Sequence, residues 1–282
     1  MIELRGKQVA DAHKEALKEK VEKLGAEGIQ LKIAVLLVGA DHGASMYAKF
    51  MEKTATAAGF AFVLSQLPDI ATQEEVVEAL QALNEDSSVH GILPLMPMPS
   101  HIDSEAIIDM LNPDKDIDGL TTYNIGLVTS GKGGFAPCTA KACIAILEHY
   151  NIPISGKHVV VVGRSQVIGK PVALMTLAAH GTVTLCHSRT PDVGAFTKQG
   201  DIVIAAAGRA HMINKDMLKP GVVVLDVGIN ELGGKTVGDV DYDSACTVAE
   251  AITPVPGGVG SVTTTMMLEA VYEAYHARNV HC

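Results

Sequence analysis

The stretch His158-Val-Val-Val-Val162, followed by Gly163-Arg-Ser-Gln-Val-Ile-Gly169-Lys-Pro171, decides the fold of this chain. The short β-branched run predicts a buried strand, and the residues after Gly169 predict a helix over 170–179. A strand, a glycine turn and a helix N-terminus together favour an anion, because backbone N–H groups face it. The glycine spacing is G-x5-G and not the common G-x-G-x-x-G. A tight turn that only requires glycine is therefore the alternative to a dinucleotide site.

The next strand, expected over 182–187, indicates which dinucleotide would bind. An NAD enzyme usually places an acidic residue at the end of this strand to bind the ribose hydroxyl. This chain has His187-Ser188-Arg189-Thr190 instead. Arg164, Ser188 and Arg189 offer donors to a 2′-phosphate, which the guanidinium fork suits. We therefore expect NADP rather than NAD, with Gly163 and Ser165 in the same site. A solvated surface charge is the alternative for Arg189, and NAD stays possible.

Two further strands extend the pattern. Residues 202–206 and 222–227 are short apolar runs that end near small residues. Ligands of open α/β sheets lie beyond the carboxyl ends of the strands. We therefore place Gly208 and Ile229 on the rim of the cofactor site.

The N-terminal part of the chain predicts a second α/β unit. Its expected elements are helices over 8–24, 45–58, 73–84 and 104–111, and strands over 31–38, 60–67 and 89–95. This order predicts parallel strands with right-handed crossovers. Residues 112–134 have no strong periodicity and are typical of a domain junction. A helix near 264–279 is expected to pack on the first domain.

Composition restricts the class of protein. The chain has 282 residues, 48% of them hydrophobic and 19% charged, which predicts a folded protein of two domains. A net charge of −10 without a basic block argues against nucleic acid and anionic membranes as partners. No apolar run approaches the roughly 20 residues of a membrane span, and no signal peptide is visible. The five cysteines lack CxxC pairs, so we expect reduced thiols, a cytoplasmic location and no metal site.

Five motifs together resemble the methylenetetrahydrofolate dehydrogenase/cyclohydrolase family. They are GRSQVIGKP (163–171), TVTLCHSRT (182–190), PDKDIDGL (113–120), PCTAKA (137–142) and ITPVPGGVG (252–260). The resemblance implies an N-terminal βαβ folate domain, a C-terminal Rossmann-like NAD(P) domain, a cleft between them and a homodimer. We expect residues 1–120 and 264–282 to form the folate-binding catalytic domain, and residues 121–263 the NAD(P)-binding domain.

The resemblance also implies roles for single residues. Tyr47 would stack on the folate, and Asp118 would bind the pterin, because a carboxylate can accept from a ring N–H and an exocyclic amine together. Pro256, Gly257 and Gly258 would line the cleft near the nicotinamide. The alternatives are a turn residue for Asp118 and a half-buried helix aromatic for Tyr47.

The chain departs from the family pattern at two linked positions. The family's catalytic lysine, four residues after the tyrosine, is Met51, and the glutamine that supports it is Leu95. At about 100° per residue, Lys49 and Lys53 lie roughly 200° and 240° around the helix from Tyr47, so neither is an obvious substitute. Ser261, where the family commonly has proline, has no interpretation.

The two departures affect one of the family's two reactions. Hydride transfer from the methylene carbon needs positioning but no proton transfer. Hydrolysis of the methenyl cation needs general acid–base groups, which Met51 and Leu95 lack. We therefore expect an NADP-dependent dehydrogenase with weak or absent cyclohydrolase activity. The alternatives are the fully bifunctional enzyme, a non-catalytic folate- or nucleotide-binding paralogue and, without motif support, a shikimate- or amino-acid-type dehydrogenase.

Overall fold

The computed structural model describes residues 1–279, so Cys282 of the cysteine prediction lies outside the described residues. The chain divides into two compact units. Unit 1 contains Met1–Ala12 and Pro137–Met266, and unit 2 contains His13–Ala136 and the chain from Met267 on. Helices α1 (Gly6–Ala26) and α10 (Gly260–Asn279) each begin in unit 1 and continue into unit 2.

Unit 1 is built on a parallel six-stranded sheet with the order β1-β11-β8-β7-β5-β6. Its strands are β1 (Ile2–Glu3), β5 (His158–Val162), β6 (Thr182–Cys186), β7 (Ile202–Ala205), β8 (Val223–Asp226) and β11 (Ala251–Ile252). The chain runs from β5 outward to β6 and then returns to β7 on the other side of β5. The strand order reverses there, and a doubly wound sheet binds its ligand at that point.

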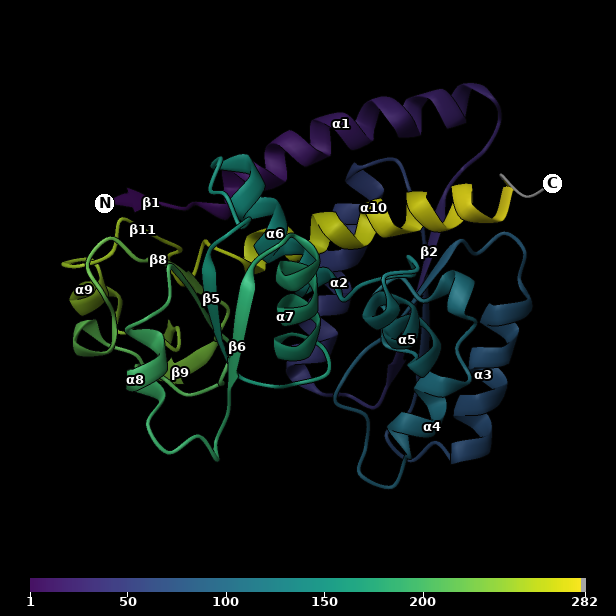
Figure 1. Cartoon of the computed structure of the whole chain (residues 1–282). Coiled ribbons are helices and arrows are strands. Elements are labelled where there is room, and N and C mark those ends of the chain that lie inside the picture. The colour runs from purple at the N-terminus through teal and green to yellow at the C-terminus, as the bar shows by residue number, and fades with distance from the viewer. Residues whose placement is uncertain (280–282) are drawn as a thin grey trace. The chain divides into compact units, whose positions relative to one another are not determined.

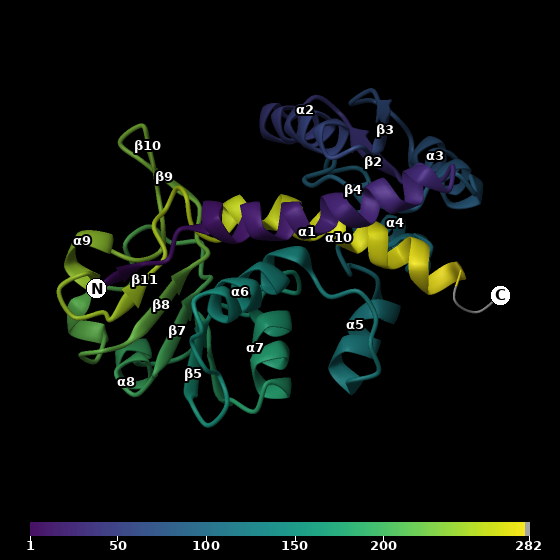
Figure 2. The same cartoon turned by 90° about the horizontal axis from the view of Figure 1, so that it is seen from above.

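Helices and short turns complete unit 1. They are α6 (Cys138–His149), α7 (Gly169–Ala178), α8 (Val193–Thr197), η2 (Lys215–Met217) and α9 (Tyr242–Ala245). Helix α7 packs against β5, β6 and α6 (Figure 1). Strands β9 (Asn230–Leu232) and β10 (Lys235–Val237) form an antiparallel hairpin that projects beyond the sheet in Figure 2. The sheet's buried valines form one apolar core with residues from α9 and the following loops.

Unit 2 contains a three-stranded parallel sheet with the order β3-β2-β4. Its elements are β2 (Lys32–Val38), α2 (His42–Ala57), β3 (Ala61–Leu67), α3 (Gln73–Glu85), β4 (Gly91–Pro94), α4 (Ser104–Asp109), η1 (Pro113–Lys115) and α5 (Thr122–Ser130). Helices α2 and α3 lie on opposite sides of β2 in both Figure 1 and Figure 2. The predicted N-cap Thr72 forms a full capping box with Glu75.

The last part of α10, from Met267 on, belongs to unit 2. Nδ1 of His13 lies 2.9 Å from a carboxylate oxygen of Glu269. The rings of His90 and Tyr275 meet edge to face with their centroids 5.3 Å apart. A side chain at Gly91 would meet the side chain of Val271 at 2.9 Å, so β4 and α10 are in close contact.

The two units differ from the predicted domain boundaries at both ends of the N-terminal half. Residues 1–12 belong to unit 1, because β1 pairs with β11 and Leu4 donates its N–H to Ile252. Residues 121–136 belong to unit 2 and include α5, which the sequence analysis placed in a junction. Asn124 at the start of α5 accepts the N–H of Phe135 and so ties this segment together.

Candidate functional site

The glycines of the turn after β5 are required by close backbone packing. Gly163 has a φ of +129°, and a Cβ there would lie 2.0 Å from the carbonyl oxygen of Ala206. A Cβ at Gly169 would lie 2.1 Å from the carbonyl oxygen of Gly163. Only glycine therefore lets the turn close against the end of β7. The G-x5-G spacing thus has a packing cause, and the turn it forms lies at the switch point of the sheet.

Ser165 shapes the entry into α7. Its Oγ accepts from the N–H groups of Ile168 at 3.2 Å and Gly169 at 3.3 Å, and its carbonyl accepts from Lys170 at 3.0 Å. The N-cap residue Ile168 offers no side-chain bond of its own, so Ser165 stabilises the first turn. This turn suits a dinucleotide pyrophosphate at the N-terminus of α7. The turn is exposed, and its glycines carry no side chain that would keep the phosphates from the backbone.

The predicted phosphate-binding side chains follow neighbouring strands. Val162 is paired with Cys186, and Gly163 donates its N–H to the Cys186 carbonyl at 2.9 Å. Arg164 comes two residues after the end of β5, and Arg189 comes three residues after the end of β6. Both side chains are exposed, as is that of Ser188. The parallel register therefore places all three at the carboxyl edge of the sheet.

A tight turn fixes the backbone beside Arg189. The His187 N–H donates to Oγ1 of Thr190 at 2.9 Å, and the Thr190 N–H returns to the His187 carbonyl at 2.8 Å. Nδ1 of His187 accepts the N–H of Arg189 at 3.1 Å. These bonds fix the backbone of the loop, and the side chain of Arg189 is exposed to solvent.

Gly208 and Ile229 follow β7 and β8 at the same edge of the sheet. Gly208 has a φ of +64°, with nothing near the position of a Cβ. Ile229 is 72% exposed, which is unusual for isoleucine in a folded protein. A large exposed apolar side chain at a strand end is suited to contact a ring of a bound ligand.

Two buried carboxylates that the sequence analysis missed hold these loops. Asp239 is 0% exposed, and its carboxylate accepts the N–H groups of Ala207 at 2.6 Å, Gly208 at 2.9 Å and Arg209 at 2.7 Å. It also accepts Nδ2 of Asn230 at 2.9 Å. One side chain therefore joins the loop after β7 to Asn230, the first residue of β9 and the end of the segment that follows β8. In the sequence, the one sign of this buried carboxylate is that Asp239 follows Gly238 in a short segment flanked by Val237 and Val240.

Asp226, at the end of β8, holds Asp239 in turn. Its carboxylate accepts the N–H groups of Gly228 at 3.1 Å, Asp239 at 3.0 Å and Val240 at 2.9 Å. The pKa of Asp226 is raised to about 6, mainly by burial. The nearby charge of Asp239 acts in the same direction, and the three N–H donors oppose both. The signal in the sequence was a single Asp inside an apolar strand.

The segment that carries the family's VPGG motif packs against the start of α1. Gly257 has a φ of +105°, and its carbonyl accepts the N–H of Gly6 at 2.8 Å. A Cβ at Gly6 would lie 2.0 Å from the carbonyl oxygen of Gly258. Pro256 and Gly257 are exposed, whereas Gly258 is buried. The first two could therefore line a site, and Gly258 serves packing.

Helix α2 of unit 2 carries Tyr47 and Met51. The Tyr47 hydroxyl donates to Sδ of Met267 on α10, and its ring is half-buried. Met51 is 0% exposed, whereas Lys49 and Lys53 are exposed. Leu95, directly after β4, is 6% exposed and donates its N–H to the Leu36 carbonyl. The structure thus buries both apolar replacements and directs both lysines to solvent.

Asp118 lies on a turn that other residues hold in place. The buried carboxylate of Asp116 accepts from the N–H groups of Leu120 and Thr121, from the Thr121 hydroxyl and from Nδ2 of Asn124. Gly119 has a φ of +59°, and a Cβ there would lie 2.1 Å from the Phe135 carbonyl oxygen. Asp116 and Gly119 therefore shape the turn that carries the half-buried Asp118.

Comparison with known proteins decides the family. Residues 4–118 match the model of the tetrahydrofolate dehydrogenase/cyclohydrolase catalytic domain, and residues 137–279 match the model of the NAD(P)-binding domain of the same family. The chain belongs to the tetrahydrofolate dehydrogenase/cyclohydrolase family. This confirms the predicted resemblance and the predicted class of two-domain α/β fold.

Individual relatives cover almost the whole chain. The bifunctional protein FolD of Desulforamulus reducens is 47% identical over 268 residues, which are 95% of this chain and 94% of that protein. The structure of the bifunctional FolD of Campylobacter jejuni matches with a TM-score of 0.96 at 40% identity and covers 99% of both chains. The Trypanosoma brucei dehydrogenase-cyclohydrolase, solved with NADP and an inhibitor, matches with a TM-score of 0.94 at 34% identity and covers 100% of this chain and 99% of that one.

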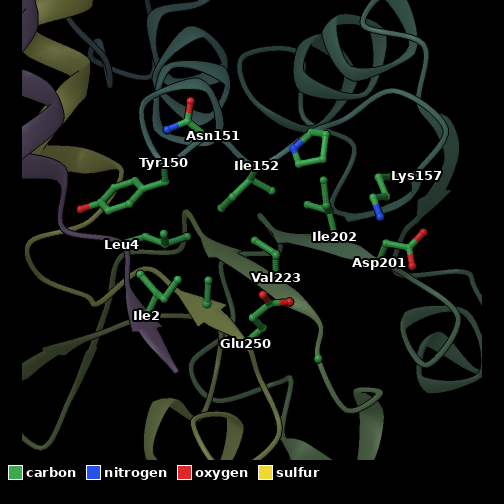
Figure 3. Close-up of a pocket in the computed structure, with 13 residues that line it drawn as sticks. Ile2, Leu4, Tyr150, Asn151, Ile152, Lys157, Asp201, Ile202, Val223 and Glu250 are labelled. Atoms are coloured by element: carbon green, nitrogen blue, oxygen red, sulfur yellow. The ribbon is translucent and has the colours of Figure 1, made fainter.

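A cavity of about 340 Å³ in unit 1 lies apart from the predicted dinucleotide-binding residues (Figure 3). Its walls include Lys157, Asp201 and Glu250, which directly precede β5, β7 and β11. The cavity therefore opens at the amino ends of the strands, whereas the glycine turn and the two arginines follow their carboxyl ends. None of the predicted site residues lines it.

Within residues 1–279 no group of three or more His, Cys, Asp or Glu side chains could hold a metal ion. No helix in that part of the chain has both the length and the hydropathy needed to cross a membrane.

Proposed function

We propose that this chain oxidises 5,10-methylenetetrahydrofolate to 5,10-methenyltetrahydrofolate with NADP+. The observation that carries the proposal is the match of both halves of the chain to one family, whose catalytic domain acts on tetrahydrofolate and whose second domain binds NAD(P). Arg164 and Arg189, exposed at the ends of neighbouring strands, favour the 2′-phosphate of NADP. The NADP in the Trypanosoma brucei structure supports the same choice.

Each half contributes binding and orientation. When bound, NADP+ supplies the hydride acceptor. Asp118 binds the pterin through its ring N–H and exocyclic amine, and Tyr47 stacks on the substrate. Residues after β7 and β8, among them Gly208 and Ile229, border the nicotinamide end. The folate nitrogens supply the electron pair as the C–H bond breaks, so no side chain has to move a proton.

Hydrolysis of the methenyl product is the family's second activity. The Desulforamulus reducens and Campylobacter jejuni relatives are both bifunctional FolD proteins, which favours the fully bifunctional enzyme over a dehydrogenase with weak hydrolysis. Met51 and Leu95 favour the weak activity, because neither side chain can activate water or protonate a ring nitrogen. Loss of such catalysis commonly costs ~10²–10⁴-fold in rate.

One experiment tests both activities. Purified protein is mixed with methylenetetrahydrofolate and NADP+, and the absorbances of NADPH and of the methenyl product are followed together. We expect NADPH to form, and a methenyl absorbance that accumulates would indicate weak hydrolysis. Rapid enzyme-dependent decay of that absorbance would show the bifunctional enzyme. Failure to reduce NADP+ or NAD+ would show a non-catalytic paralogue and contradict the proposal.

Two further properties are proposed on the family resemblance. The folate substrate is assigned to unit 2 and the dinucleotide to unit 1. We also expect a homodimer, which light scattering of the purified protein would measure.

A further inference from the structure

We propose that Asp239 is a positioning residue for the nicotinamide half of the bound dinucleotide. The inference rests on the proposed function and adds a residue that no motif of the family match singled out. In this proposal Asp239 does not touch the dinucleotide itself. It acts through the loops after β7 and β8, which border the position of the nicotinamide.

Four hydrogen-bond donors converge on the buried carboxylate of Asp239. The N–H groups of three consecutive residues, 207–209, point at the Asp239 carboxylate, at 2.6 to 2.9 Å. Nδ2 of Asn230, at the start of β9 and the end of the segment after β8, provides a fourth donor. Each carboxylate oxygen therefore accepts two hydrogen bonds. An ionised carboxylate can accept four donors in this way, whereas a neutral amide would turn one acceptor into a donor.

The backbone around the two carboxylates is packed so closely that it leaves no room for side chains at Gly228 and Gly238. A Cβ at Gly228 would lie 2.2 Å from a carboxylate oxygen of Asp239. A Cβ at Gly238 would lie 1.8 Å from a carboxylate oxygen of Asp226. Both glycines are thus required by the two carboxylates. Asp226 accepts the N–H of Asp239 and so joins the end of β8 to this network.

The segments after β7 and β8 lie at the carboxyl edge of the sheet, on one side of its switch point. In a doubly wound sheet the dinucleotide crosses the switch point at the carboxyl edge, with its two halves on opposite sides. The adenosine side is at the ends of β5 and β6, where Arg164 and Arg189 lie. The nicotinamide side is at the ends of β7 and β8, which Asp239 joins. Loss of this carboxylate should therefore affect one half of the ligand and not the other.

The test compares two ligands on the Asp239→Asn variant. Binding of NADP+ and of adenosine 2′,5′-bisphosphate, which lacks the nicotinamide half, is measured by calorimetry. We expect the NADP+ dissociation constant to rise about tenfold to hundredfold, because charge-assisted hydrogen bonds are lost. The dissociation constant of the bisphosphate should stay within about twofold of the wild type. The control is Asp243→Asn, the same substitution at an exposed residue of α9, which should change neither.

Each other outcome contradicts the inference. An unchanged NADP+ affinity in the folded variant would remove the positioning role. Equal weakening of both ligands would show a general structural role. If the wild type itself binds neither ligand, the proposed function fails first and the inference with it. If Asp239→Asn does not fold, the same binding test is made on Asn230→Ala, which removes only one of the four donors to Asp239. It should raise the NADP+ dissociation constant about twofold to tenfold and spare the bisphosphate.

Discussion

The hydroxyl of Tyr47 donates a hydrogen bond to Sδ of Met267, with 3.2 Å between the two atoms. A thioether is a weak acceptor, so this bond contributes little to the position of the ring. The proposed role of Tyr47 is stacking, which needs the ring and not the hydroxyl. Tyr47→Phe should therefore keep the KM for methylenetetrahydrofolate within about twofold, and Tyr47→Ala should raise it about tenfold or more. Steady-state kinetics measure both, and equal effects of the two variants would contradict stacking.

Restoring the family's polar pair should restore hydrolysis. In a Met51→Lys, Leu95→Gln double variant we expect the enzyme-dependent decay of the methenyl absorbance to rise about tenfold or more, because the variant restores both the lysine and the glutamine that supports it. Phe50→Lys, which adds a lysine at an exposed position of the same helix, is the control and should not change the decay. Met51→Lys alone places a lysine where methionine is fully buried, so we also expect it to lower stability. A folded double variant without faster decay would show that other groups limit hydrolysis.

Arg189 should set the preference for NADP+ over NAD+. In Arg189→Ala the KM for NADP+ should rise about tenfold to hundredfold, because a charge-assisted bond to the 2′-phosphate is lost. The KM for NAD+, which lacks that phosphate, should change little. Lys198→Ala, at another exposed cation of unit 1, is the control. A parallel rise for both dinucleotides would indicate that Arg189 does not read the phosphate.

Asp226 should make stability depend on pH. Its pKa is raised from 3.8 to about 6 in the folded state, so the folded protein binds more protons than the unfolded chain between these values. The contribution of Asp226 is therefore fully present below about pH 4 and lost as the pH rises through about 6, by roughly 3 kcal/mol. Urea unfolding of the wild type and of Asp226→Asn at several pH values measures it. As the pH rises through about 6, the free energy of unfolding of the wild type should fall relative to that of Asp226→Asn. Parallel pH profiles of the two proteins would contradict the raised pKa of Asp226.

Lys115 should stabilise unit 2 rather than bind substrate, although it lies in the motif PDKDIDGL. It is 2% exposed, and its Nζ donates to the carbonyl oxygens of Leu83, Asn84 and Asp86 at the end of α3. Lys115→Met leaves these carbonyls without their donor and should cost roughly 2–4 kcal/mol in the free energy of unfolding. Urea denaturation measures the cost, and Lys132→Met, at an exposed lysine, is the control. A cost no larger than that of the control would contradict the capping role.

The local elements of this protein followed from its sequence. The strand His158–Val162 was predicted with its observed bounds, and Thr72 was predicted as the N-cap of α3. These features depend on side-chain periodicity and on hydrogen bonds within a few residues, which the sequence displays directly. Helix α5 was missed because its nine residues include Gly126 and show no apolar face. Strands β1 and β11 were missed because each has two residues and exists only through pairing with distant partners.

The candidate site divides in the same way. The glycine turn, the arginines after β5 and β6, and the apolar replacements Met51 and Leu95 were all evident in the sequence. Only the tertiary structure revealed that Asp226 and Asp239 are buried. The N–H groups that bind Asp239 lie 30 to 32 residues earlier in the chain, and Asp239 and Val240 reach Asp226 from 13 and 14 residues later. A buried carboxylate is stable only when several donors bind it, because it has lost its contact with water. Only the packing of the sheet brings those donors together.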